Sequence, residues 1–203
     1  MKTMKIGLLG GTFDPIHEGH IALARKVLAA RSLDEIWVIP SHIPPHRNEP
    51  IALPDQRYHM CKLALENKEH FVLSDIEYNR REKSFFIDTI NYLKSRYPNR
   101  DFFFIIGIDA FLDFLSWKEP IKLLHECKLI VINRPGYKSE EFYNFMNTTI
   151  LKDYNDSVSY LNIETPNVSS TEIREKIKNG DDVSSLLDKH VLEYINQKGL
   201  YKK

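Results

Sequence analysis

The amino-acid sequence predicts an α/β protein with a Rossmann-like, doubly wound, mostly parallel sheet and helices on both of its faces. Short apolar runs alternate along the chain with longer segments of helical periodicity, as in consecutive β–α–β units. The run 102–106, Phe-Phe-Phe-Ile-Ile, is apolar on both faces, so helices should cover both faces of its sheet. A glycine turn directly follows the first apolar run, at the strand end where such sheets bind their ligands.

The expected elements alternate in a regular order. Strands are expected at 5–10, 35–40, 71–75, 101–107 and 128–133, with a weaker candidate at 159–163. Helices are expected at 18–31, 55–67, 84–97, 108–114 with 119–126, 140–146, 169–178 and 188–198. Gly199 fits a helix stop, and the proline-rich stretch 43–54 predicts a semi-rigid loop after the second strand.

Length and composition narrow the class of protein. The chain has 203 residues, which favours a single domain, with a sheet core at 1–165 and a small C-terminal helical segment at 166–203. Lys plus Arg and Asp plus Glu number 28 each, which argues against a nucleic-acid partner. Cys61 and Cys127 lie far apart, which predicts reduced thiols.

The start of the chain lacks a signal-peptide core, and no apolar run reaches the length of a membrane helix. We therefore expect a cytoplasmic protein without a membrane partner. Dimers are compatible with such a fold, although the sequence does not fix the oligomeric state.

The segment 10–20, GGTFDPIHEGH, is the strongest candidate site. Gly10 and Gly11 permit a tight turn and close approach of a ligand, but the loop matches neither the dinucleotide fingerprint nor a P-loop. His17 and His20 are three residues apart and share one face of the following helix. Backbone N–H groups, a helix N-terminus and two imidazoles around one point suit a polyphosphate. Ordinary core histidines are the alternative, and no third ligand with matching spacing supports a metal site.

The segment 168–174, VSSTEIR, is the second candidate. Ser169 and Glu172 read as a capping box, which would explain these two residues alone. The box does not explain Arg174, because the helix dipole disfavours a cation in the first turns. An anion bound at the helix N-terminus would remove this conflict. The predicted phosphate ligands are Ser170, Thr171 and Arg174.

Together the two segments resemble the nucleotidyltransferase superfamily, whose motifs are GxFDxxHxGH and (I/V)SSTxIR. Over almost the full chain, in collinear order, the sequence is similar to bacterial nicotinate-nucleotide adenylyltransferases. The further matches are PPHR at 44–47, part of an SYTxDT segment at 84–89, FIIGxD with a later LxxW at 104–117, RPG at 134–136 and NQKGLY at 196–201. One departure is Phe86, which replaces the family threonine beside the nicotinate carboxylate. A backbone N–H contact would survive this replacement, whereas a hydroxyl contact would not.

The resemblance implies adenylyl transfer from ATP to nicotinate mononucleotide, which gives deamido-NAD and pyrophosphate in NAD biosynthesis. It implies direct in-line attack without a covalent intermediate, with Mg²⁺ carried by ATP and no protein metal site. The implied catalytic residues are His17, His20 and Arg174. The implied ATP-binding residues are Gly10, Gly11, Thr12, Phe13, His17, Gly19, His20, Gly107, Ser170, Thr171 and Arg174. The implied nicotinate mononucleotide-binding residues are His46, Arg47, Phe86, Asp109, Trp117 and Arg134.

Other interpretations stay open. Trp117 fits core packing as well as stacking on the nicotinate ring, and Asp109 fits a helix N-cap as well as a ribose contact. Nicotinamide-mononucleotide adenylyltransferase, pantetheine-phosphate adenylyltransferase and cytidylyltransferase activities share the fold. Class I aminoacyl-tRNA synthetases share HxGH, but the chain leaves no room for an anticodon-binding domain. A non-catalytic nucleotide-binding module is the last alternative.

Overall fold

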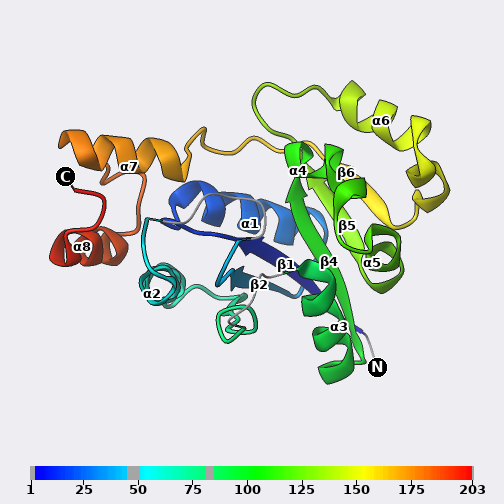
Figure 1. Ribbon diagram of the computed structural model, residues 1–203, viewed down its shortest axis with the longest axis horizontal. Helices are drawn as coiled ribbons and strands as arrows, with labels where there is room; N and C mark the ends of the chain where they lie inside the picture. The colour runs from blue at the N-terminus through cyan, green and yellow to red at the C-terminus, as the bar shows by residue number, and fades with distance from the viewer. Residues whose placement is uncertain (1–2, 45–50, 81–84, 203) are drawn as a thin grey trace. The chain divides into compact units, whose positions relative to one another are not determined.

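The computed structural model describes residues 3–44, 51–80 and 85–202. Its six strands form one sheet in the order β3-β2-β1-β4-β5-β6 (Figure 1). The chain thus extends the sheet from β1 in one direction and then in the other, as the predicted doubly wound topology requires. The pairs β1–β4, β4–β5 and β5–β6 are parallel. The strands are β1 (Met4–Gly11), β2 (Glu35–Pro40), β3 (Phe71–Leu73), β4 (Arg100–Gly107), β5 (Lys128–Ile132) and β6 (Val158–Leu161).

The predicted helices are present, with ends shifted by a few residues. They are α1 (Glu18–Ala30), α2 (Pro54–Leu65), α3 (Phe86–Arg96), α4 (Ile108–Leu112), α5 (Pro120–Glu126), α6 (Ser139–Thr148), α7 (Ser170–Asn179) and α8 (Lys189–Lys198). A 3-10 turn, η1 (Phe114–Ser116), replaces the end of the helix expected at 108–114, and a second, η2 (Ile150–Tyr154), was not expected. Within the described ranges, no helix is both long and apolar enough to cross a membrane.

The chain comprises two compact units. Unit 1 consists of Met1–Gly10, Val27–Ile36 and Phe85–Glu164, and unit 2 consists of Gly11–Lys26, Trp37–Ser84 and Thr165–Lys203. The chain enters unit 2 for the last time at Thr165, at the expected start of the C-terminal helical segment. The single-domain organisation stays a prediction.

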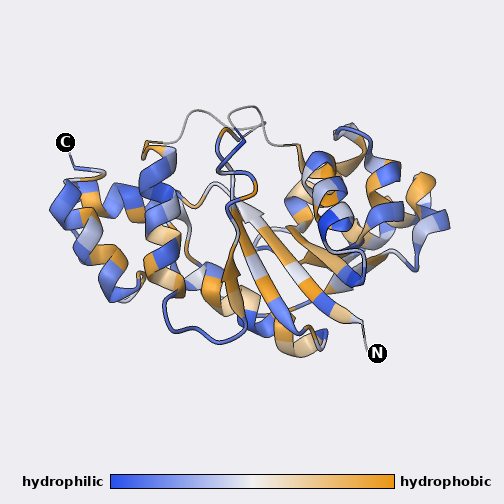
Figure 2. Ribbon diagram, turned by 90° about the horizontal axis from the view of Figure 1, so that it is seen from below, coloured by the Kyte–Doolittle hydropathy of each residue, from blue (hydrophilic) through white to orange (hydrophobic). Residues whose placement is uncertain are grey.

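In unit 1 both faces of the sheet are covered. A side chain at Gly7 would meet Leu33 and Ile105 within about 3 Å, so this face is tightly packed. The neighbouring strand residue Phe104 points to the opposite face, where its ring stacks on Phe86 of α3 with centroids 3.5 Å apart. The run at 102–106 is therefore packed on both sides, as its composition predicted, and Figure 2 colours much of the strands apolar.

In unit 2, α2 packs against α8 and β3. The apolar side chains of Met60 on α2 and of Val191 and Ile195 on α8 are fully buried. Helix α8 ends at Lys198, and its C-cap is Gly199, whose φ of 61° is left-handed and whose N–H bonds to the carbonyl of Ile195. The predicted helix stop is confirmed.

Cys61 and Cys127 are free, buried thiols. Burial raises the pKa of Cys61 and raises the pKa of Cys127 to about 12. Because the thiolate is the nucleophile, we expect neither residue to react with iodoacetamide in the native protein at about pH 8. Mass spectrometry should count two modified cysteines only after unfolding in urea. Native labelling as fast as that of the unfolded chain would contradict the burial of the labelled thiol.

Candidate nucleotidyltransferase site

The two histidines of the glycine-rich segment stack on each other in unit 2. Their ring centroids are 3.7 Å apart with an interplanar angle of 27°. Helix α1 begins at Glu18, as predicted, and His17 is the residue directly before it. The backbone N–H of His17 donates to Nδ1 of His20 over 3.2 Å. Because Nδ1 accepts, the neutral His20 ring carries its proton on Nε2, which becomes a hydrogen-bond donor.

Gly19, which has no side chain, and Phe13, which has a left-handed backbone, pack against the two imidazoles. A Cβ added to Gly19 would lie 2.7 Å from Cγ1 of Val168 and 2.9 Å from Nδ1 of His17, which leaves no room for a side chain. Phe13 has a left-handed φ of 50°, and its ring meets that of His20 edge-on with centroids 5.1 Å apart. The turn and the first helical turn are therefore packed around the histidine pair.

The second predicted motif begins α7 in unit 2. The Ser169 side chain caps the helix by accepting from the N–H of Glu172 over 3.1 Å, so the cap is confirmed. Nη2 of Arg174 donates to the hydroxyl of Thr171 over 3.1 Å. Two of the predicted phosphate ligands are thus in direct contact.

Hydrogen bonds join the first turns of α7 to the glycine-rich segment. Nη1 of Arg174 donates to the carbonyl of Asp14 over 2.7 Å, and the hydroxyl of Ser170 donates to the carbonyl of Pro15 over 2.9 Å. The Asp14 carboxylate also lies 4.0 Å from Nη1 of Arg174, which gives this cation a second reason for its position. The Arg174 guanidinium has five N–H donors, which is more than these hydrogen bonds use, so it can also donate to a phosphate. Unit 2 therefore brings the two sequence motifs into one cluster.

The ends of β4 and β5 carry further predicted residues in unit 1. Nε of Arg134 lies 3.4 Å from Oδ1 of Asp109, and both side chains are about half exposed. Gly107, which was expected to bind ATP, caps α4 beneath this pair, and any side chain there would collide with both. The N-cap prediction for Asp109 is wrong, because the cap is Gly107 and Asp109 lies in the first turn. An exposed ion pair contributes only about 0–1 kcal/mol, so it is weak evidence for a structural role.

Unit 1 also contains an aromatic cluster, which joins α3, β4 and the segment that follows α4. Phe86 stacks on Phe104 with an interplanar angle of 10°, and Trp117 tilts against Phe104 at 6.0 Å and against Phe114 at 5.6 Å. Phe86 opens α3, where N–H groups have no intrahelical acceptor, so this position keeps a backbone donor. The Phe86 ring therefore packs against β4. Trp117 is half-buried, which is compatible with packing and with stacking on a ligand.

Two charged residues, one in each unit, were not predicted from the sequence to support the site. Lys118, next to Trp117, lies 3.0 Å from the Asp88 carboxylate of α3. Arg57 is fully buried on α2. Arg57 extends the buried face that Met60 and later α2 residues form at helical spacing, so periodicity could have placed it inside.

Five predicted positions remain to be placed. Gly11 is the last residue of β1 and Thr12 follows it, both in unit 2. His46 and Arg47 lie outside the described residues. Gly10 is exposed at the last position of β1 that belongs to unit 1. Among the described residues, no group of three or more His, Cys, Asp or Glu side chains could hold a metal ion.

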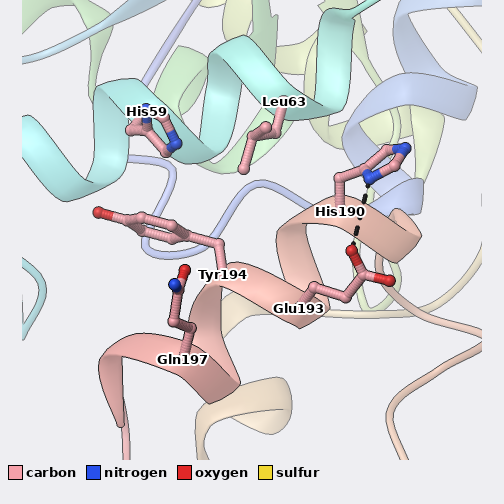
Figure 3. A pocket seen from close by; sticks show the side chains of 6 residues that line it. All are labelled: His59, Leu63, His190, Glu193, Tyr194 and Gln197. Carbon is pink, nitrogen blue, oxygen red and sulfur yellow. Dashed lines mark ion pairs between the residues drawn. The ribbon is translucent and has the colours of Figure 1, made fainter.

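A pocket of about 370 Å³ lies between α2 and α8 (Figure 3). The ring of His59 packs 4.6 Å from that of Tyr194, and Nδ1 of His190 lies 3.6 Å from Oε2 of Glu193. The lining residues are His59, Leu63, His190, Glu193, Tyr194 and Gln197. None of them was predicted to bind a substrate, so this pocket is separate from the predicted set of site residues.

Comparison with known proteins identifies the family. The family model described as Cytidylyltransferase-like matches residues 8–176. A Clostridium tetani protein named "Probable nicotinate-nucleotide adenylyltransferase" is 38% identical over 199 residues, which covers 98% of this chain and 99% of that protein. A protein of the same name from Halalkalibacterium halodurans is 42% identical over 202 residues, with 98% and 91% covered.

A solved structure confirms the predicted fold class. The structure named "Plasmodium falciparum nicotinic acid mononucleotide adenylyltransferase complexed with NaAD" superposes with a TM-score of 0.80 at 24% identity. The alignment covers 98% of this chain and 97% of that one. The matches in sequence show the family: this chain belongs to the cytidylyltransferase-like family and, within it, to the nicotinate-nucleotide adenylyltransferases.

Proposed function

We propose that this chain transfers the adenylyl group of ATP to nicotinate mononucleotide and releases deamido-NAD and pyrophosphate. The observation that carries the proposal is the stacked pair of His17 and His20, with the Nε2 donor of His20 fixed by the backbone of His17. Family membership supports it, because the matched relatives are named for this reaction.

The reaction needs positioning and charge stabilisation more than proton transfer. The 5′-phosphate oxygen of the mononucleotide forms a bond to the α-phosphorus of ATP, and the bond from that phosphorus to the bridging oxygen breaks as pyrophosphate leaves. The attacking oxygen is already anionic, so a general base is not required. In this proposal His17 and His20 donate to the α- and β-phosphate oxygens, where negative charge develops. The β- and γ-phosphates are held by Ser170, Thr171 and Arg174.

The residues proposed to bind the pyridine ring and the ribose of nicotinate mononucleotide belong to unit 1. The indole of Trp117 offers a flat surface for the pyridine ring, and the Asp109 carboxylate can accept hydrogen bonds from ribose hydroxyls. Arg134 would counter negative charge, and Phe86 would contribute its backbone N–H to the nicotinate carboxylate. His46 and Arg47 stay predicted ligands of the reacting phosphates.

Mg²⁺ is proposed to arrive with ATP. This cation prefers oxygen ligands and usually keeps several waters, so phosphate oxygens and water molecules can supply most of its ligands. The side chains proposed around the phosphates are N–H and O–H donors, which suits them to hold phosphate oxygens and not the cation. When bound, Mg²⁺ supplies neutralising charge on the phosphates. The cytoplasmic location, the lack of a nucleic-acid partner and the oligomeric state stay predictions.

Product analysis tests the proposal. Purified protein with ATP, Mg²⁺ and nicotinate mononucleotide should release pyrophosphate and form deamido-NAD, measured by a coupled assay and mass spectrometry. Parallel reactions replace the acceptor by nicotinamide mononucleotide or 4′-phosphopantetheine, and ATP by CTP. The highest kcat/KM is expected for nicotinate mononucleotide with ATP. A preference for nicotinamide mononucleotide would change the acceptor and keep the reaction type, whereas no pyrophosphate release with any acceptor would favour a binding module.

The substitution Arg174→Ala should mainly weaken ATP handling. Charge-assisted hydrogen bonds contribute about 1.5–3 kcal/mol, so the KM for ATP should rise about 10-fold or more. The KM for nicotinate mononucleotide should change little, because Arg174 is not among its proposed ligands. Lys178→Ala, at the exposed end of the same helix, is the matched control. Unchanged ATP kinetics in Arg174→Ala would leave this arginine only its contacts with Asp14 and Thr171.

A further inference from the structure

Arg57 of α2 is charged and yet fully buried. Its guanidinium donates to the carbonyls of Thr12 and Ser41, each over 2.7 Å, of His42 over 2.8 Å and of Ala52 over 3.3 Å. A cation is retained in a protein interior only when its charge and its hydrogen-bonding groups are well compensated. The Arg57 guanidinium therefore connects three backbone segments by hydrogen bonds: the segment after β1, the segment after β2 and the segment before α2. All three belong to unit 2.

The contact with Thr12 fixes the orientation of the next residue. A trans peptide holds its C=O and N–H on opposite sides, so anchoring the Thr12 carbonyl on Arg57 turns the N–H of Phe13 away from the guanidinium. Phe13 also adopts a φ of 50°, which bulky residues avoid unless their surroundings impose it. Arg57 thus supports a strained turn that leads directly into the histidine pair.

A second set of contacts holds the same turn through Asp14. Its carboxylate is buried and accepts from the N–H of Ile51 over 2.9 Å, the N–H of Ala52 over 3.2 Å and the hydroxyl of Tyr201 over 2.7 Å. Burial, and then the Asp14 charge, raises the pKa of Tyr201, so its hydroxyl stays protonated and able to donate. Ala52 contacts both Asp14 and Arg57, so one buried network runs from Arg57 to Tyr201.

We propose that Arg57 and Tyr201 are positioning residues for the phosphate-binding turn, acting through Thr12 and Asp14 without touching a substrate. The Asp14 carbonyl is also the acceptor for Arg174, so the backbone that the network fixes is the backbone that orients the α7 motif. The inference rests on the proposed function for its kinetic readout, and on the folded structure alone for its contacts.

Two conservative variants test it. Arg57→Lys keeps the charge, but a single ammonium cannot reproduce the fork that reaches four carbonyls. Tyr201→Phe keeps the ring and removes only the donor to Asp14. We expect kcat to fall about 10-fold or more in Arg57→Lys, since small misplacements of reacting groups are costly, and about 5-fold in Tyr201→Phe. The KM for nicotinate mononucleotide should stay within about twofold, because no unit 1 ligand is altered.

Leu65→Ala is the matched control for lost stability. Leu65 is buried near the end of α2, and the contacts that define the network do not include it. All variants are assayed at a temperature at which circular dichroism shows them folded. We expect Leu65→Ala to lower Tm and to leave kcat within about twofold of the parental value, because the turn keeps its anchors. This comparison separates positioning from general destabilisation.

Each outcome decides the proposal. A loss of kcat in Arg57→Lys that exceeds the loss in Leu65→Ala supports it, and equal losses overturn it. If Arg57→Lys does not fold, Tyr201→Phe decides by the same comparison. If Arg57→Lys loses activity and Tyr201→Phe does not, the role of Tyr201 is overturned.

If the parental protein transfers no adenylyl group, the proposed function fails by itself, and calorimetric affinity for ATP–Mg²⁺ becomes the readout. Weaker affinity in Arg57→Lys than in Leu65→Ala then supports positioning, and equal affinity overturns it.

Discussion

Replacing His20 by alanine is expected to lower kcat by about 100-fold or more, the size of loss seen when one transition-state donor is removed. His20 is partly exposed at the start of α1, and its Nδ1 is occupied by the N–H of His17. Its remaining nitrogen, Nε2, therefore carries the proton and can donate to a phosphate oxygen. Stability should change little, because the substitution lies in the first turn of a helix and removes no fully buried group.

The donor role can be separated from the role in packing by two amide variants. In His20→Gln the amide nitrogen can take the place of Nε2, whereas in His20→Asn the amide oxygen can accept from His17 but no donor reaches as far. We expect His20→Gln to retain more kcat than His20→Asn, while both keep a Tm near the parental value. Stopped-flow or steady-state pyrophosphate release measures the difference, with His190→Ala on α8 as the control. A folded His20→Ala protein with near-parental turnover would remove His20 from the reaction.

The fold could be predicted from the sequence because each of its main signals is local. The apolar run of β4 reads as a strand packed on both faces. The turn predicted at Gly10 and Gly11 is wrong in its position, because both glycines end β1 and the turn into α1 begins after them. The cap at Ser169 and the stop at Gly199 depend only on residues within one helical turn. The motifs identified which segments along the chain contain the predicted site residues, which composition alone would not have shown.

The remaining features depend on register and tertiary contacts. In the β4–β5 ladder the last residues, Gly107 and Ile132, are paired, so Asp109 and Arg134, each two residues past the end of its strand, come together as an ion pair. The elements were predictable, but their register was not, so the Asp109–Arg134 ion pair could not be predicted. The alternative N-cap role of Asp109 failed for another reason, because α4 begins one residue before Asp109 and is capped by Gly107. The carbonyls around Arg57 come from segments as much as 45 residues away, beyond the reach of any local pattern.

Introducing a methyl group at Gly19 should abolish most activity while leaving the fold intact. In Gly19→Ala the new Cβ would lie 2.7 Å from Cγ1 of Val168 and 2.9 Å from Nδ1 of His17, closer than non-bonded atoms tolerate. The His17 imidazole must then move, and a displacement of about 1 Å at a reacting group can cost on the order of 100-fold in rate. We expect kcat to fall by a factor of that order.

Stability and activity should respond to this change in different ways. Alanine is a better helix former than glycine, by about 1 kcal/mol in a helix interior and by less in the first turn, which offsets part of the steric cost in α1. In the double variant Gly19→Ala, Val168→Ala, the clash with the valine is removed while the clash with His17 persists. Thermal unfolding should therefore show a recovered Tm, whereas kcat should stay low. Val168→Ala alone is the control, and recovery of kcat in the double variant would show that Val168, not His17, transmits the effect of residue 19 to the reaction.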